Sequence, residues 1–328
     1  MIIRHRLIER NRTMQNYEKM NLDLQKKFTE LKKSRPDLGK RRLNFSWSNW
    51  GFGIEPLQQS LARLSKYGIS FIELHGNHYG DSIGYKVPEV KRMLSDFGIR
   101  AAGVCGMFSA DNDLSSNRGI QRQAAVDYIR READFCAEIG AEYMLVCPAA
   151  VGRPQKYDDS EIERSLVTMR IAADALSDRG IKGAVEPIRS AETTIIHTVA
   201  QAKEYIRRLD HPGVRHINGD VYHMLSEEVN VPSAVYDAGE MLVNLHLADS
   251  NRRALGDGCL NIDDIIRALY LIGYDDEHHF ATPEPLGPGG DPYPAQHAIT
   301  DPAILDELVR KSVTYFRARE EAVLSGEG

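Results

Sequence analysis

The strongest constraint on the fold is an alternation of short apolar runs with longer amphipathic segments, which repeats eight times after residue 42. The expected strands are brief and continuously apolar, as in a parallel sheet that is buried on both faces. We expect strands at 43–47, 70–74, 100–105, 143–147, 182–186, 214–219, 242–246 and 279–283. We expect helices at 55–66, 87–97, 118–139, 160–177, 196–209, 233–238, 262–272 and 304–319.

Glycines follow several of the expected helices, as in Tyr67-Gly68, Phe97-Gly98 and Ile139-Gly140, where the chain turns left-handed. Eight strand–helix units in about 280 residues predict an α/β fold of the (β/α)8 TIM barrel type. A doubly wound sheet is the alternative. It would need a glycine-rich first turn, and the sequence has neither a GxGxxG nor a Walker-type motif.

Residues 1–42 precede the repeating pattern and predict an amphipathic helical extension to a barrel domain at 43–328. Apolar residues recur there at spacings of three and four, at Tyr17, Met20, Leu24, Phe28 and Leu31. Two roles are open for this helix. It packs on its own barrel, or it forms an arm for a neighbouring subunit.

Potential metal ligands end four consecutive expected strands: Glu186, Asp220, His246 and Glu284. The carboxyl ends of the strands form the active-site face of a TIM barrel, so these side chains should converge. One carboxylate at a strand end is more often only solvated, but four such ends in a row seldom arise by chance. Three carboxylates and one imidazole favour Mn²⁺, Mg²⁺ or Co²⁺, whereas structural zinc would need more sulfur or nitrogen.

Three further polar residues lie close to these ligands in the sequence. Glu192 follows Glu186 by six residues, His223 follows Asp220 by three, and Arg252 follows His246 by six. His223 and Arg252 can donate hydrogen bonds to sugar oxygens, and Glu192 can bind a hydroxyl. Each of them alone would be read as a solvated loop residue or a core histidine.

These stretches carry a family resemblance, which covers roughly residues 43–322. The motifs are Val185-Glu186-Pro187 with Glu192, Asp220-Val221-Tyr222-His223, His246 to Arg253, and Thr282-Pro283-Glu284-Pro285. They resemble the ketose 3-epimerases, in the sugar isomerase/epimerase group of xylose-isomerase-like TIM barrels. The resemblance implies that the four ligands hold a divalent metal, with Mn²⁺ the first expectation. It also implies that Glu186 and Glu284 are the acid/base pair, and that His223, Glu192 and Arg252 bind substrate oxygens.

Loops near the expected site depart from small ketose enzymes. The loop after the first strand, which includes Trp47, is rich in aromatic residues and glycine, and the loop after the second strand contains His75 and His78. These loops are either ordinary barrel-mouth packing or an apolar wall that suits a substrate larger than a free ketose. With the extension included, the chain is similar to the larger (α) subunit of bacterial C-glycoside deglycosidases.

That second resemblance implies a lyase that cleaves a 3-oxo-C-glycoside, a small β-rich partner subunit, and a histidine that assists the leaving group. His75, His78 and His223 are the candidates for this catalytic histidine. The alternative is a ketose 3-epimerase or related isomerase acting on a keto-sugar. Both reactions start when a carboxylate removes the proton beside the carbonyl, which a divalent metal makes more acidic. We expect an oligomer in either case.

Two remote alternatives come from other classes. An endonuclease of the AP type would need a trinuclear zinc cluster, but the third strand ends in Cys105, and Asn251-Arg252-Arg253 stands where an Asp-x-His pair would be needed. The net charge of −6 also argues against a nucleic-acid partner. A non-catalytic scaffold would not need the complete ligand set. No apolar run approaches the roughly 18 residues of a membrane span, and we expect a cytoplasmic protein.

Overall fold

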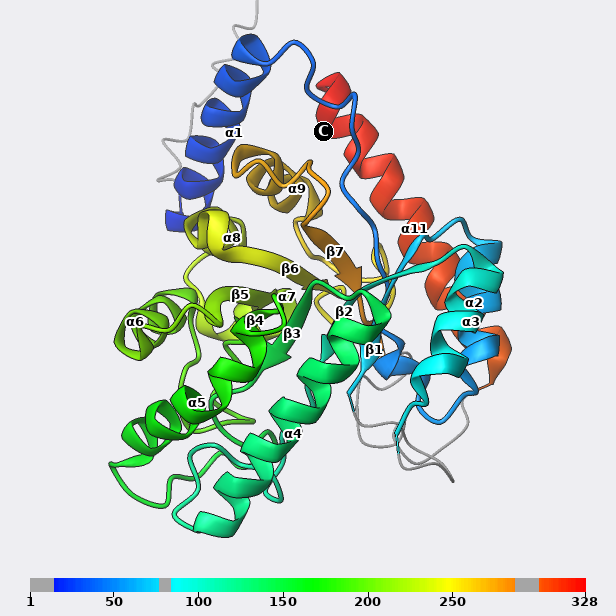
Figure 1. Ribbon diagram of the computed structural model, residues 1–328. Coiled ribbons are helices and arrows are strands. Elements are labelled where there is room, and N and C mark those ends of the chain that lie inside the picture. Colours follow the sequence, from blue (N-terminus) through cyan, green and yellow to red (C-terminus); the bar gives the residue numbers. More distant parts are fainter. Residues whose placement is uncertain (1–14, 77–83, 287–300) are drawn as a thin grey trace, which may run out of the picture.

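The computed structural model describes residues 15–76, 84–286 and 301–328. Seven parallel strands form one sheet whose spatial order follows the sequence (Figure 1). The strands are β1 (Phe71–His75), β2 (Arg100–Cys105), β3 (Tyr143–Val146), β4 (Lys182–Val185), β5 (Val214–Asp220), β6 (Leu242–Leu247) and β7 (Phe280–Pro283). The expected TIM barrel is therefore confirmed, with helices around the outside of the sheet.

Helices follow the strands as the apolar periodicity predicts. They are α2 (Leu57–Lys66), α3 (Val87–Phe97), α4 (Gly119–Ile139), α5 (Glu161–Ser177), α6 (Val199–Leu209), α7 (Val221–Glu227), α8 (Val231–Ala238), α9 (Ile262–Leu271) and α11 (Pro302–Ser325). Two 3-10 turns, η1 (Asn49–Phe52) and η2 (Gly239–Met241), complete the described elements. Between β5 and β6 we expected only the helix at 233–238, so α7 is an element that the sequence reading missed.

The segment expected as the first strand is the main departure from eight regular strands. It makes only two isolated parallel bridges, Phe45 to Ala281 of β7 and Ser48 to Glu73 of β1. Its backbone bonds are divided between these two neighbours: Ser46 N donates to Ala281 O over 2.9 Å, and Glu73 N donates to the Trp47 carbonyl over 2.9 Å. The segment therefore closes the barrel between β7 and β1 without forming a continuous ladder.

Helix α1 (Asn16–Ser34) lies beside α8 and α9 on the outside of the same barrel (Figure 1). Leu24 and Phe28 are buried there, and the Phe28 ring lies 6.4 Å from the ring of Tyr270 in α9. Arg35 pairs with Asp275 at 2.9 Å just beyond the helix. The middle of the apolar stripe, at Leu24 and Phe28, is thus covered by the chain's own helices, as the first of the two predicted roles requires, whereas Tyr17 at its start is 51% exposed.

The lower barrel interior is filled by a small apolar cluster that includes Phe71, Tyr143 and Phe280. Phe71 and Phe280 stand two residues before Glu73 and Thr282, so each pair points to the same side of its strand. The Tyr143 ring lies so close to Gly103 that a Cβ there would come within 2.5 Å of it, so only glycine fits. This plug forms the floor beneath the polar residues described next.

Candidate metal centre and active site

Polar side chains enter the barrel in pairs at the carboxyl ends of three neighbouring strands. The pairs are Asn218 with Asp220, Asn244 with His246, and Thr282 with Glu284. Residues two apart on a strand share a face, and all six side chains are buried. Asp220 is in register with His246, and Asn218 with Asn244. The sequence thus builds a lower polar layer and an upper layer of potential ligands.

The upper layer contains two groups of residues that could each hold a metal ion. One group is Glu186, Asp220 and His223, and the other is Asp220, His246 and Glu284; within each, the ligand atoms lie within 4.8 Å of one another. The geometry brings together all four predicted ligands, with Asp220 common to both groups. It also places His223 among the potential ligands, whereas the sequence predicted a role for it with substrate.

His246 is oriented by a residue that the sequence reading missed. Its Nε2 lies 2.9 Å from Glu73 Oε2, and its Nδ1 lies 3.4 Å from Glu186 Oε1 and 3.4 Å from Glu284 Oε2. Glu73 is fully buried in β1 and also accepts a bond from the Tyr143 hydroxyl over 2.8 Å. When Nε2 donates to Glu73, the lone pair of Nδ1 faces the two carboxylates, as a metal-binding histidine requires.

The lower polar layer is a continuous hydrogen-bonded row across β5, β6 and β7. Thr282 donates to Asn244 Oδ1 over 2.6 Å, Asn244 donates to Asn218 Oδ1 over 2.7 Å, and Asn218 donates to Glu186 Oε1 over 2.9 Å. Buried polar groups are tolerated when their bonds are satisfied in this way. The row fixes the position of one carboxylate of the site from below.

Charges in the upper layer perturb one another strongly. Burial raises the pKa of Glu284 to about 8, and the Asp220 and Glu186 carboxylates act in the same direction against His246 and Arg252. Burial opposes a charge on His246 too, but the carboxylates of Glu284 and Glu73 outweigh it and raise the pKa of His246 well above its usual range. The cluster therefore has more negative charge than its own cations offset.

These residues fit a divalent cation. Asp220 Oδ1 caps α7 by accepting from Tyr222 N over 2.8 Å. Asp220 Oδ2 is buried, makes no hydrogen bond among the described residues, and has His223 Nε2 as a neighbour at 3.3 Å. A buried carboxylate oxygen without a partner is costly unless a cation or a donor meets it. Oxygen ligands with one imidazole suit Mn²⁺, Mg²⁺ or Co²⁺, and the ligand set stays a proposal.

The predicted substrate residue Arg252 lies beside this cluster, with its Nη2 3.6 Å from Glu284 Oε1. Glu192 is further out and pairs with Arg189. Arg189 in turn donates to the Tyr222 hydroxyl over 2.9 Å, and the Tyr222 ring lies under the Arg252 guanidinium at 4.4 Å. Glu192 is thus linked to the site through two intervening side chains.

The remaining predicted residues belong to the loops around the barrel mouth. His75 ends β1 and is buried, and its backbone N–H donates to Asn49 Oδ1 over 2.9 Å. Trp47 is also buried and stacks on Phe52 with ring centroids 5.9 Å apart. His78 lies outside the described residues. The aromatic loop that includes Trp47 folds inward as η1, with Asn49 to Phe52 all buried.

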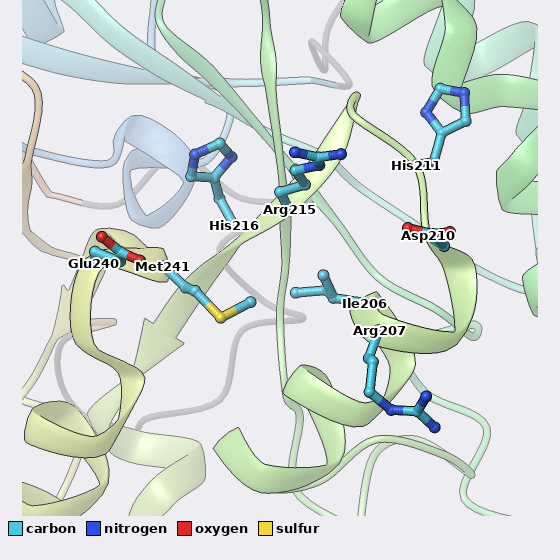
Figure 2. A pocket seen from close by; sticks show the side chains of 8 residues that line it. All are labelled: Ile206, Arg207, Asp210, His211, Arg215, His216, Glu240 and Met241. Carbon is cyan, nitrogen blue, oxygen red and sulfur yellow. The ribbon is translucent and has the colours of Figure 1, made fainter.

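A pocket of about 470 Å³ lies at the other end of the strands (Figure 2). It is lined from α6, η2 and the start of β5 by Ile206, Arg207, Asp210, His211, Arg215, His216, Glu240 and Met241. His216 and Asp220 are four residues apart on β5, roughly 13 Å at the rise of a strand. Neither potential metal group includes a residue of this pocket.

Comparison with known proteins now places the chain. The family described as the xylose isomerase-like TIM barrel matches it over residues 61–299, which is most of its length. The chain belongs to this family. The resemblance inferred from the strand-end motifs is therefore confirmed.

Relatives of this xylose isomerase-like barrel are named as sugar epimerases. The chain is 29% identical over 228 residues to the ketose 3-epimerase of Arthrobacter globiformis, covering 68% of this chain and 76% of that one. It is 26% identical over 238 residues to the 3-dehydro-D-guloside 4-epimerase of Escherichia coli K12, covering 69% and 87%. The crystal structure of D-allulose 3-epimerase from Methylomonas sp. superposes with a TM-score of 0.73 at 21% identity, covering 85% and 98%.

These relatives support an enzyme of the sugar epimerase/isomerase type, which was our alternative reading. The first expectation, a lyase that cleaves C-glycosides, finds no support in the names of these relatives. The strand-end motifs do not separate the two reactions, because the proton removal that the resemblance implies for them is a step that both reactions need. Among the described helices, none is long and apolar enough to cross a membrane.

Proposed function

We propose that this chain is a metal-dependent epimerase that inverts the carbon next to the carbonyl of a keto-sugar. The observation that carries the proposal is the convergence of two carboxylates on one imidazole. Glu186 comes from the end of β4 and Glu284 from the end of β7, and an oxygen of each lies 3.4 Å from His246 Nδ1. Inversion needs a base on one face of the substrate and an acid on the other, and two such carboxylates can supply both.

The proton chemistry follows from these two groups. One glutamate removes the proton from the carbon beside the carbonyl, and the electron pair moves into the sugar to give an enediolate. The other glutamate returns a proton to the opposite face of the same carbon, so the carbonyl is restored with inverted configuration. A divalent cation in the site supplies Lewis acidity for the carbonyl oxygen. Burial of both carboxylates, 7% and 5% exposed for Glu186 and Glu284, keeps water away from this exchange.

Names of the relatives support this reaction class. A ketose 3-epimerase and a 3-dehydroguloside 4-epimerase both invert a carbon next to a carbonyl, although their substrates differ. The lyase hypothesis shares the proton removal but then needs expulsion of a leaving group. We therefore propose return of the proton, with a free ketose as the first substrate class and a 3-keto-glycoside as the second.

Solvent exchange during turnover tests the proposal. Protein loaded with Mn²⁺ is incubated with D-fructose in D₂O, and the products are followed by carbon and proton NMR. We expect D-allulose with deuterium at C3. A 3-keto-glucoside in a second sample should be inverted at C4, whereas release of an aglycone from a 3-oxo-C-glycoside would support the lyase. If the protein neither inverts a keto-sugar nor exchanges its proton for deuterium, the proposal is rejected. Size-exclusion chromatography tests the predicted oligomer and small β-rich partner.

A further inference from the structure

The Arg252 guanidinium lies over two aromatic rings beside the carboxylate cluster. Its guanidinium carbon lies 4.4 Å from the ring centroid of Tyr222 and 5.4 Å from that of Trp50. Tyr222 precedes His223 at the start of α7, and Trp50 is in η1. Both cation–π contacts are strengthened by burial, and Arg252 is only 4% exposed. The head group is therefore positioned before any ligand arrives.

Backbone contacts make this arrangement rigid. Arg252 has a positive φ of 59°, an unfavourable conformation for a long side chain. It is maintained because Arg252 N donates to Asp249 O over 2.7 Å and Leu286 N donates to Arg252 O over 3.0 Å. At Gly51, the residue after Trp50, an added Cβ would lie 2.9 Å from Pro285 O. The loops after β6 and β7 and the η1 turn are thus packed together.

Three N–H donors of Trp50 and Arg252 have no acceptor in the part of the chain that the structure describes. Trp50 Nε1, Arg252 Nε and Arg252 Nη1 are buried and lack a hydrogen-bond partner among the described residues. Each buried donor left without an acceptor destabilises the fold, so such groups are rare unless function needs them. Because the Nη2 of the same guanidinium is 3.6 Å from Glu284 Oε1, these donors stand beside a carboxylate that we assign to proton transfer.

We infer that Trp50 Nε1 is a specificity-determining donor to a neutral oxygen of the keto-sugar, and that it forms a donor subsite with Arg252, for which the family resemblance already implies a contact with substrate oxygens. This inference rests on the proposed function. A neutral ligand oxygen is favoured over an anionic one because Glu284, Asp220 and Glu186 lie close by. An anionic group would be repelled by these carboxylates. Hydroxyl and carbonyl oxygens of a sugar accept hydrogen bonds without adding charge.

Tyr222 is the positioning residue of the subsite. Its hydroxyl accepts from Arg189 Nη1 over 2.9 Å, and the Arg189 guanidinium carbon lies 4.7 Å from the same ring that contacts Arg252. Glu192 pairs with Arg189 from outside. This row of side chains holds the Tyr222 ring against Arg252, so it gives Glu192 an indirect link to the site.

The test compares Trp50→Phe, which keeps a ring against Arg252 but has no N–H, with Trp50→Leu, which loses both. For D-fructose we expect Trp50→Phe to raise KM roughly five- to tenfold, the effect of one hydrogen bond, with kcat within about twofold of the wild type. Trp50→Leu should be affected at least as strongly. Equal KM values for Trp50→Phe and the wild type overturn the inference, as does a loss seen only in Trp50→Leu, because stacking alone would explain it.

A binding measurement separates this inference from the proposed reaction. D-mannitol has the hydroxyls of a hexulose but no carbonyl, so it occupies the site without reacting. Calorimetry should show weaker D-mannitol binding to Trp50→Phe by the same factor, even if the wild type epimerises no ketose. The chain has only two tryptophans, so the indole N–H signal that is absent from the Trp50 variants should shift in the NMR spectrum of the wild type when D-mannitol is added. No shift, no binding, or tighter binding of a sugar acid than of its neutral analogue overturns the inference.

Discussion

The two ends of strand β5 carry similar residue types but differ in what those residues face. At the amino end, Arg215 and His216 line the pocket in Figure 2, together with further histidine, arginine and acidic side chains. At the carboxyl end, Asp220 meets carboxylates from the ends of β4 and β7 and imidazoles from β6 and α7 within a few ångströms. Composition alone would not distinguish the two ends. The difference lies in convergence, because the carboxyl ends of parallel strands aim their side chains at one point.

Two histidines show the electrostatic consequence. Burial lowers the pKa of His216 to about 4, and the positive charges of Lys182, His279 and Arg215 add to this effect. His246 is more deeply buried, yet the Glu284 and Glu73 carboxylates raise its pKa well above the usual range. Opposite charges around His246 make a site for a cation, whereas like charges around His216 only keep that ring neutral. A pocket with polar walls is therefore a weaker sign of function than a cluster of unbalanced charge.

The sharpest test of this contrast is Glu284→Gln. The amide cannot take a proton from carbon, so we expect the rate of epimerisation to fall about 10³-fold or more, measured by NMR on protein loaded with Mn²⁺. The matched control is Glu320→Gln in α11, a buried glutamate that accepts from Leu43 N and the Tyr270 hydroxyl. This control should lower the melting temperature but keep kcat within about twofold. Equal loss of activity in both variants would remove Glu284 from the chemistry.

Glu73→Gln should have the next largest effect, and on metal binding rather than on proton transfer. Loss of the charged partner at 2.9 Å from His246 Nε2 weakens the orientation and basicity of the ring, so the affinity for Mn²⁺ should fall about 10- to 100-fold. Calorimetric titration of metal-free protein measures this. Tyr143→Phe removes only one donor to Glu73 and should produce a smaller loss. Unchanged Mn²⁺ affinity in Glu73→Gln would exclude a role for this pair in the metal site.

The fold was predictable from the sequence because the strands are buried on both faces and stand out as apolar runs. The observed bounds of β1 to β7 differ from the expected ones by no more than one residue at either end. The segment 43–47 was expected to be a regular strand, but it makes only isolated bridges, one to β7 and one, through Ser48, to β1. Helix α7 was missed because it begins directly after Asp220 with no turn residue, and the Asp220 side chain itself caps it.

The site was predictable as far as strand ends reveal it. Glu186, Asp220, His246 and Glu284 follow apolar runs and could be found by position. Glu73 was missed because it lies inside a run, in Phe71-Ile72-Glu73-Leu74. A charge in the middle of a strand buried on both faces needs a buried partner, and this signal would have identified it. The sequence predicted Trp50 only as part of an aromatic loop. Its contact with Arg252 joins two distant turns, and no sequence spacing predicts such a contact.

The smallest expected effect concerns the amino end of the barrel. His216 has a folded pKa of about 4, below its ordinary value of 6.5, so the unfolded chain takes up a proton first as the pH falls. The stability linked to this ring is fully present above pH 6.5 and is lost between about 6.5 and 4. At about 1.4 kcal/mol per pKa unit, reduced for the partial exposure of the ring, the free energy of unfolding falls by roughly 2 kcal/mol.

The variant His216→Gln tests this, because glutamine takes up no proton in this pH range. Denaturant unfolding should show the variant losing less stability than the wild type between pH 7 and 4.5. Epimerisation at pH 7 should be unchanged, because the pocket is remote from Asp220. Equal loss of stability in both proteins, or a fall in activity at pH 7, would contradict the separation of the two ends of β5.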